Sequence, residues 1–171
     1  MKKSLRILEA IASTSLMLSK YFLALGSVWG WWLSILGYIL TSFFNVKIKL
    51  KAVAGIVAGL AVLSAYGLYK WTYYISGLQL FDWIVIIVSL ILSIILIIKE
   101  VKTKRPYWMF QAIGIIAFAF AFITLGMKME IGWYVLLIGH INNTYLYYKK
   151  EAYIISVMQV VSIVIVLVKI F

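Results

Sequence analysis

The chain has no cysteine, a single proline, a single histidine and only five acidic residues among its 171 residues. The missing cysteine excludes both a disulfide framework and a thiolate metal site. The sequence also contains no nucleophile–histidine–acid signature, no cluster of histidine and acidic metal ligands and no phosphate-binding glycine loop. We therefore predict that the protein is not an enzyme and that it carries no metal and no cofactor.

Apolar residues, in contrast, are present in excess. Hydrophobic residues make up 65% of the chain, whereas soluble domains contain about 45–50%. A membrane-spanning helix needs about 20 mostly apolar residues, because hydrocarbon offers no partners to its backbone polar groups. We predict an all-α integral membrane protein with the lipid bilayer as its solvent and seven transmembrane helices. The apolar runs are Ile7–Leu25, Val28–Phe44, Ala52–Tyr69, Leu80–Ile98, Tyr107–Leu125, Ile131–Tyr148 and Ala152–Val168.

The first apolar run follows Lys2, Lys3 and Arg6, which is the arrangement of a signal peptide. The interior of the run, however, carries Glu9 and Lys20, and no small-residue cleavage site follows it. We therefore predict that this segment is retained as a transmembrane helix.

The formal net charge of +11 would indicate nucleic acid as the partner of a soluble protein. Here the basic residues are instead sorted between the two sides of the predicted membrane helices, so no nucleic-acid partner is expected. By the positive-inside rule, the N-terminus is cytosolic and the C-terminus is external, in the plasma membrane. Twelve of the 16 basic residues fall on the predicted cytosolic side, and only Lys20, Lys70, Lys128 and Lys169 do not.

Two decapeptides resemble each other at a constant offset of 102 residues: GWWLSILGYI at 30–39 and GWYVLLIGHI at 132–141. Each opens a helix, repeats glycine after seven residues and leads to a lysine cluster. We predict a single transmembrane domain over 1–171 in a 3+1+3 parallel-repeat bundle, with repeat 1 at about 1–70, a connector helix at about 71–101 and repeat 2 at about 102–171. The alternative is that two membrane helices share glycine and tryptophan by chance.

Polar residues inside hydrocarbon are costly and are therefore candidates for function, with helix packing as the alternative. Asp82 lies near the start of the fourth apolar run, with Gln79 on the same helical face and Trp83 beside it. In a functional role, Asp82 would neutralise the charge of a cationic solute or carry a proton. The alternative is that Asp82 is an interfacial carboxylate that contacts water or pairs with Lys70.

The sixth apolar run carries His140, Asn143 and Tyr147 on one helical face, whereas Asn142 points elsewhere. His140 would relay a proton or contact a solute, or it is a packing residue. Gln111, Gln159 and Trp133 add two amides and an aromatic ring to the set. The predicted substrate-binding residues are Gln79, Asp82, Trp83, Gln111, Trp133, His140, Asn143 and Gln159.

Two further patterns bear on packing. Most tryptophans are expected in the interfacial belts of the bilayer; those considered are Trp29, Trp31, Trp32, Trp83, Trp108 and Trp133. Gly55 and Gly59 have the G-x-x-x-G spacing that lets two helices approach closely. We read that spacing first as packing within the chain and second as the contact of a homo-oligomer.

Short motifs at Gly67-Leu68-Tyr69, Leu78-Gln79 and Gly132-Trp133-Tyr134, together with the 3+1+3 order, resemble the SWEET-like superfamily, in particular the Pnu-type vitamin transporters that move nicotinamide riboside. The absence of a Pro-Gln pair argues against the sugar-transporting branch. The resemblance implies facilitated diffusion, with intracellular phosphorylation trapping the solute. It also implies stacking of the solute on Trp83 or Trp133 and hydrogen bonds from Gln79, Asn143 and Gln159.

The predicted function is therefore a membrane facilitator for a small vitamin or nucleoside-like solute such as nicotinamide riboside. One alternative is the substrate-binding membrane subunit of an ATPase-driven vitamin importer, which would also be small and very hydrophobic. Another is a non-transporting membrane protein in which every polar group only joins helices. Co-purification with an ATPase would favour the first alternative, and a structure without a cavity near the midplane would favour the second.

Overall fold

The computed structural model describes residues 3–47, 51–73, 79–103 and 107–171. Within these residues the protein has seven helices and no strand, which confirms the predicted all-α class. The helices are α1 Lys3–Ala24, α2 Trp29–Lys47, α3 Lys51–Thr72, α4 Leu80–Thr103, α5 Trp108–Gly126, α6 Ile131–Lys149 and α7 Tyr153–Ile170. Lys2, Lys49, Lys104, Arg105 and Leu78, which entered the sequence argument, lie outside the described residues.

Five helices, α1, α3, α4, α5 and α7, are long and apolar enough to cross a membrane. The other two, α2 and α6, carry more polar residues, but each has 19 residues and packs between two of the five. Helix α2 lies between α1 and α3, and α6 lies between α5 and α7. Several of their polar side chains are therefore buried in protein and not exposed to lipid: Ser34, Thr41, Asn45, His140 and Asn142. The chain is thus a multi-pass membrane protein.

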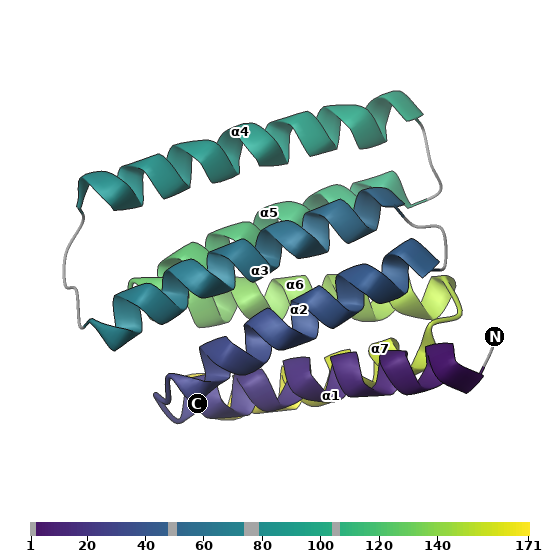
Figure 1. The fold of residues 1–171 in the computed structure, drawn as a ribbon, viewed down its shortest axis with the longest axis horizontal. Coiled ribbons are helices and arrows are strands. Elements are labelled where there is room, and N and C mark those ends of the chain that lie inside the picture. Colours follow the sequence, from purple (N-terminus) through teal and green to yellow (C-terminus); the bar gives the residue numbers. More distant parts are fainter. Residues whose placement is uncertain (1–2, 48–50, 74–78, 104–106) are drawn as a thin grey trace.

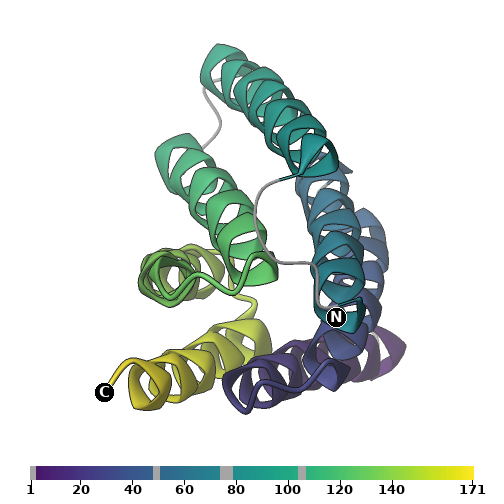
Figure 2. The same ribbon diagram turned by 90° about the vertical axis from the view of Figure 1, so that its left-hand side faces the viewer.

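The helices form two triplets, α1–α2–α3 and α5–α6–α7, which meet where α1 packs on α7 and α3 packs on α5 (Figures 1 and 2). Helix α4 stands at the edge of the bundle and packs on α5. Most of its large apolar side chains are exposed, as expected of a helix that faces lipid. This distribution of contacts is the one that a 3+1+3 bundle requires.

The two ends of the bundle differ in charge. The end at which α1 begins and α2 ends, here called the lysine-rich end, carries Lys3, Lys47, Lys99, Lys102 and Lys149. The opposite end, here called the far end, holds the turn between α1 and α2, the turn between α5 and α6, and the start of α4.

The turns at the ends of α1 and α5 have the same backbone geometry. Gly26 and Lys128 both adopt a left-handed conformation, with φ of 73° and 59°. The Gly26 N–H donates to the Leu23 carbonyl at 2.9 Å, and the Lys128 N–H donates to the Leu125 carbonyl at 3.0 Å. Both are the helix-ending motif in which a left-handed residue closes the last turn. The equivalent residues are 102 positions apart.

Close helix contacts recur at the same offset. A Cβ on Gly30 would lie 2.6 Å from the Leu23 side chain, and one on Gly132 would lie 2.7 Å from the Leu125 side chain. Glycine is needed at both positions because the paired helices touch there. The same offset relates the contact of Gly37 with Leu16 to that of Gly139 with Phe118.

The second and third helices of each triplet are also joined by equivalent hydrogen bonds. The Ser42 hydroxyl donates to the Ala54 carbonyl at 2.9 Å, and the Ser156 hydroxyl donates to the Thr144 carbonyl at 3.0 Å. Position 42 corresponds to 144 and position 54 to 156 at the offset of 102. The division of the chain into repeats, with the boundaries given above, stays our proposal, and these recurrences support it.

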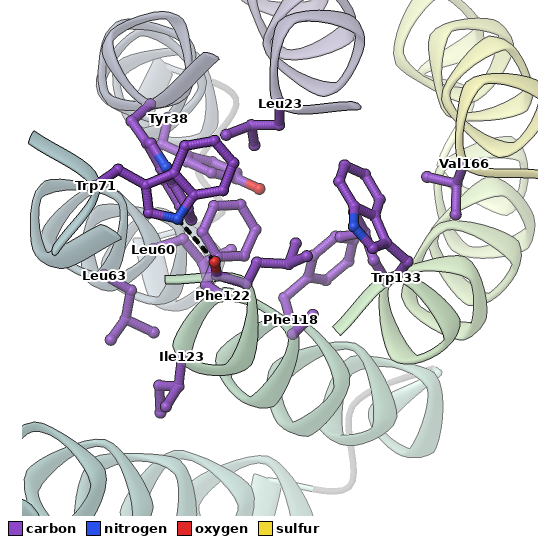
Figure 3. Packing of buried hydrophobic residues seen from close by; sticks show 14 of the residues in the cluster. Leu23, Tyr38, Leu60, Leu63, Trp71, Phe118, Phe122, Ile123, Trp133 and Val166 are labelled. Atoms are coloured by element: carbon purple, nitrogen blue, oxygen red, sulfur yellow. Dashed lines mark hydrogen bonds between the residues drawn. The ribbon is translucent and has the colours of Figure 1, made fainter. Parts of the chain in front are cut away.

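Two hydrophobic clusters fill the interior. The larger cluster includes Trp31, whose ring meets those of Trp71 and Phe122 edge-on at centroid distances of 5.7 and 5.8 Å. Trp71 also donates its ring N–H to the Leu125 carbonyl at 3.0 Å, which ties α3 to α5 (Figure 3). The smaller cluster lies at the lysine-rich end and consists of Phe44, Tyr147 and Ile155.

The predicted tryptophan belt is only partly present. Trp29, Trp32 and Trp83 are exposed, as the prediction requires. Trp31 and Trp133, however, are only 0% and 7% exposed and belong to the larger cluster, so the prediction is wrong for them. The difference arises because each follows a glycine that brings its helix close to the preceding one.

The prediction that Gly55 and Gly59 pack within the chain is wrong. A Cβ added at either glycine would meet nothing within 4 Å. Both residues instead line an apolar groove of about 900 Å³, bounded by α3, α4 and α5. Self-association as a homo-oligomer stays a prediction.

Candidate functional site

A polar cavity of about 40 Å³ lies between the two triplets. It is at the middle level of the bundle, because Tyr38 and His140, which both line it, are the central residues of the 19-residue helices α2 and α6. The described lining residues are Ser13, Leu16, Lys20, Tyr38, Thr41, Val57, Leu60, Phe118, His140, Asn143, Tyr147, Ile155, Met158, Gln159 and Ser162.

Ten of these 15 residues form five pairs separated by 102 positions. The cavity therefore lies between equivalent surfaces of the two triplets, which is where transporters built from parallel repeats bind their solutes. The pairs are Leu16 with Phe118, Tyr38 with His140, Thr41 with Asn143, Val57 with Gln159, and Leu60 with Ser162.

The polar atoms of the cavity are not all satisfied. The Nδ1 atom of His140 is hydrogen-bonded to the side-chain oxygen of Gln159. Among the described residues, neither His140 Nε2 nor the Ser13 hydroxyl has a hydrogen-bond partner, although both are buried. Two polar groups are therefore available to a solute.

Lys20 brings a charged group to the cavity. Its side chain is 1% exposed, and its ammonium donates to the Ser19 hydroxyl at 2.9 Å. The ammonium also lies 5.5 Å from the ring centroid of Tyr38 and 5.3 Å from that of Phe122. No aspartate or glutamate is present among the described residues that line the cavity.

Hydrophobic side chains close the cavity on both sides. Toward the far end lie Trp31 and Trp71 of the larger cluster, and toward the lysine-rich end lies the smaller cluster of Phe44, Tyr147 and Ile155. The enclosed volume accommodates a few water molecules, whereas ligand sites measure about 300–1,000 Å³. The structure is thus a closed conformation, and the helices must separate before an organic solute can enter.

Three of the eight predicted site residues, His140, Asn143 and Gln159, line the cavity. Gln111 is buried near the lysine-rich end of α5, and Trp133 is buried in the larger cluster; neither is among the lining residues.

The remaining three, Gln79, Asp82 and Trp83, lie at the far end, where α4 begins. Asp82 is buried and forms an ion pair with Lys70 at 2.9 Å. It also accepts hydrogen bonds at 2.8 Å from the Tyr66 hydroxyl and from the Gln79 backbone N–H. Trp83 is exposed. These residues join α4 to α3 and do not belong to the central cavity.

Sequence reasoning missed Ser13, Lys20, Tyr38, Thr41 and Phe118 as cavity residues. The repeat carried a usable signal for two of them, because Tyr38 and Thr41 are the counterparts of His140 and Asn143 at the offset of 102. For Lys20 the signal was a lysine inside an apolar run.

An all-helical protein that crosses the membrane several times, with a closed cavity between two helix triplets, has the architecture of a membrane transporter. The chain belongs to the nicotinamide mononucleotide transporter family, whose model matches residues 6–171. It is thus a membrane transporter for a nicotinamide-related solute, as the Pnu-type resemblance predicted. Comparison with curated proteins and with solved structures gives no match.

Proposed function

We propose that the protein is a facilitator that carries a small nicotinamide-containing solute through the central cavity, which opens in turn to either end. Nicotinamide riboside is the solute that the Pnu-type resemblance names. The observation that carries the proposal is the cavity itself, which is lined by five residue pairs separated by 102 positions and contains His140 Nε2, an atom without a hydrogen-bond partner among the described residues.

The lining residues match the chemistry of a nicotinamide group. The carboxamide of the solute can both donate and accept, so it can hydrogen-bond His140 Nε2 in either tautomer of the ring, while Gln159 holds Nδ1. Asn143 and Ser13 offer further polar groups to the carboxamide oxygen or to ribose hydroxyls. Phe118 provides an aromatic ring for the flat pyridine. In this assignment Gln159 is a positioning residue that acts through His140.

We place the lysine-rich end in the cytosol and the C-terminus outside the cell, in the plasma membrane, on the basis of the lysine distribution. The recurrence of contacts at the offset of 102 supports placing the family within the SWEET-like superfamily. The protein performs no chemistry on the solute. Phosphorylation of the solute inside the cell then supplies the direction of net uptake.

The test is uptake of radiolabelled nicotinamide riboside by liposomes containing the purified protein, with and without an internal kinase. Uptake is expected to saturate and to exceed that of empty liposomes. His140→Ala removes an interaction made to the solute at a buried site and is expected to lower uptake by about ten-fold or more. Gln159→Ala should also lower uptake, because the His140 ring loses the hydrogen bond that holds its orientation.

Gln79→Ala is the matched control, because this amide side chain is exposed and lies outside the cavity. It is expected to leave uptake unchanged. If folded His140→Ala protein shows the same uptake as the wild-type protein, the solute does not pass through the central cavity.

A further inference from the structure

The apolar groove lined by Gly55 and Gly59 is far larger than the central cavity. Helix α4 packs on α5, and the groove lies between α4 and α3 (Figures 1 and 2). It extends along α3 from Gly55 to Tyr69, which is roughly 21 Å at the rise of an α-helix. Its volume of about 900 Å³ is within the range of about 300–1,000 Å³ that ligand sites occupy. The groove can therefore hold an organic ligand in the structure as it stands.

The walls of the groove are almost entirely hydrocarbon. No charged side chain is present among the described lining residues, and their only polar side-chain groups are the hydroxyls of Tyr66, Tyr69, Ser89 and Ser93. A water-soluble ligand would therefore leave most of its polar groups without partners there. Wall residues such as Val62 and Val88 are exposed, so the groove is open to the lipid. We therefore expect an occupant that is mostly apolar and comes from the bilayer.

Aromatic rings close the groove at the far end. The ring centroid of Phe81 lies 6.1 Å from that of Tyr66 and 5.8 Å from that of Tyr69. The Tyr66 hydroxyl also donates to Asp82 at 2.8 Å, which holds α3 and α4 together at this end. An occupant with a polar headgroup must therefore place that headgroup at the opposite, lysine-rich end.

Basic residues continue the groove face of α4 at the lysine-rich end. Lys99 follows the lining residue Leu92 by seven positions and the lining residue Ile95 by four, so the three share a helical face. Lys102 follows Ile95 by seven positions and Lys99 by three. Both lysines are exposed. The groove thus combines apolar walls with two positive charges at one end.

We propose that the groove binds an anionic phospholipid, whose acyl chains lie between α3 and α4 and whose phosphate group contacts Lys99 and Lys102. Basic pockets between membrane helices bind lipid headgroups in this way. The acyl chains cover the apolar walls, and the lysines neutralise the charge of the headgroup. Helix α4 is then attached to the first triplet by Asp82 at the far end and by the lipid over the rest of its length. The inference goes beyond the proposed function, because it concerns a lipid and not the solute.

The charge of the groove favours a lipid over a second copy of the chain. A second copy inserted in the same orientation would bring its own lysine-rich end to the region of Lys99 and Lys102. Like charges would then meet, which is unfavourable. A phosphate group supplies the opposite charge.

The test measures lipid binding to the purified full-length protein in detergent by native mass spectrometry, which counts bound lipids and associated copies of the chain. Phosphatidylglycerol and phosphatidylcholine with identical acyl chains are compared, so that only the headgroup differs. The wild-type protein is expected to bind phosphatidylglycerol about ten-fold more tightly, because two lysines attract its headgroup.

The double variant Lys99→Met with Lys102→Met removes both charges and is expected to reduce this preference to within about two-fold. The matched control is Lys3→Met with Lys149→Met, which makes the same charge change at exposed positions of the lysine-rich end, on α1 and α6. The control should retain the ten-fold preference.

A second variant tests the groove itself. A Cβ on Gly59 meets nothing within 4 Å, so the side chain of Gly59→Leu extends into the groove without a clash. It is expected to lower the affinity for both lipids by about ten-fold, the effect of displacing roughly two buried methylene groups. Ala58→Leu is the matched control, because Ala58 is exposed on the same helix and is not among the described lining residues. It should leave both affinities unchanged.

Equal binding of the two lipids by the wild-type protein would overturn selection of an anionic headgroup. Unchanged binding by Gly59→Leu would overturn the groove as the site. If neither lipid binds and Gly59→Leu separates associated copies, the groove is an interface between copies and the proposal fails. The wild-type comparison needs no variant, so the test holds even if a variant does not fold. The proposed function is decided separately, by uptake of nicotinamide riboside.

Discussion

At the scale of single residues, Asp82 shows how one carboxylate can fasten a peripheral helix. It is the third residue of α4, and it accepts the backbone N–H of Gln79, just before the helix begins. This is the acid half of a capping box. The second carboxylate contact is the ion pair with Lys70, which reaches across from α3. One side chain therefore both starts α4 and attaches it to the first triplet.

Asp82→Ala is expected to lower the free energy of unfolding by about 3–5 kcal/mol, because it removes one member of a buried ion pair. The double variant Asp82→Leu with Lys70→Met removes both charges and is expected to recover most of this loss. Thermal or chemical unfolding in detergent measures both values. If the double variant is less stable than Asp82→Ala, the two residues do not act as a buried pair.

Residue spacing predicted some of the residues that line the cavity and missed others for physical reasons. His140 and Asn143 were found because residues three apart share a helical face, and Gln159 was found as an amide in hydrocarbon. Lys20 was noted but left out of the site, because spacing along one helix does not reveal which helix packs over a side chain. Asp82 was predicted as a site residue with pairing to Lys70 as the alternative, and the structure contains this ion pair.

At the scale of helices, the contact between α1 and α2 depends on Gly30. A Cβ at this position would lie 2.7 Å from both the Leu23 backbone nitrogen and the Ser19 carbonyl oxygen. Backbone atoms inside a helix cannot move aside, so the two helices would have to separate. Gly59 offers the opposite case, because a Cβ there meets nothing within 4 Å.

Gly30→Ala is therefore expected to lower the free energy of unfolding by about 1–3 kcal/mol, the usual cost of overpacking. Gly59→Ala, the matched control, should be neutral or stabilising by up to about 1 kcal/mol, because alanine favours helix more than glycine does. The free energies of unfolding of both variants are measured in detergent and compared with that of the wild-type protein. Equal effects would mean that α1 and α2 are not held together at Gly30.

The helices were predictable and their arrangement less so. The seven apolar runs match the observed elements closely because the demand for internal backbone hydrogen bonds fixes their type and length. Hydropathy does not distinguish a helix that faces lipid from one inside a bundle. The fifth run, which is largely buried as α5, therefore gave the same signal as the fourth, which stands at the edge as α4.

At the scale of the whole molecule, the cavity is closed by two hydrophobic barriers of unequal size. The barrier toward the far end contains Trp31 and Trp71, and it includes the hydrogen bond from Trp71 to Leu125 between the triplets. The barrier toward the lysine-rich end is the three-residue cluster around Phe44. Alternating access requires each barrier to open while the other stays closed.

A single introduced cysteine can report this opening, because the native chain contains none. Thr41→Cys places the thiol in the cavity wall, where a membrane-impermeant maleimide is expected to react slowly. Adding Trp71→Ala should raise the labelling rate from the far end only, and adding Phe44→Ala from the lysine-rich end only. The expected increase is about ten-fold, as the population of the open state shifts.

Thr41→Cys alone and the native chain serve as controls for this labelling. If each truncation raised labelling equally from both sides, the two clusters would not be separate barriers. Equal labelling with and without the truncations would mean that neither cluster controls access to the cavity.

The five residue pairs of the cavity are equivalent in position but not in chemistry. Val57 and Leu60 of α3 are replaced by Gln159 and Ser162 of α7. A cavity with identical halves would hold an unsymmetrical molecule in two poses of equal energy, related by half a turn about the axis between the triplets. Unlike halves remove this degeneracy, so a solute bound in the cavity is expected to adopt one fixed orientation.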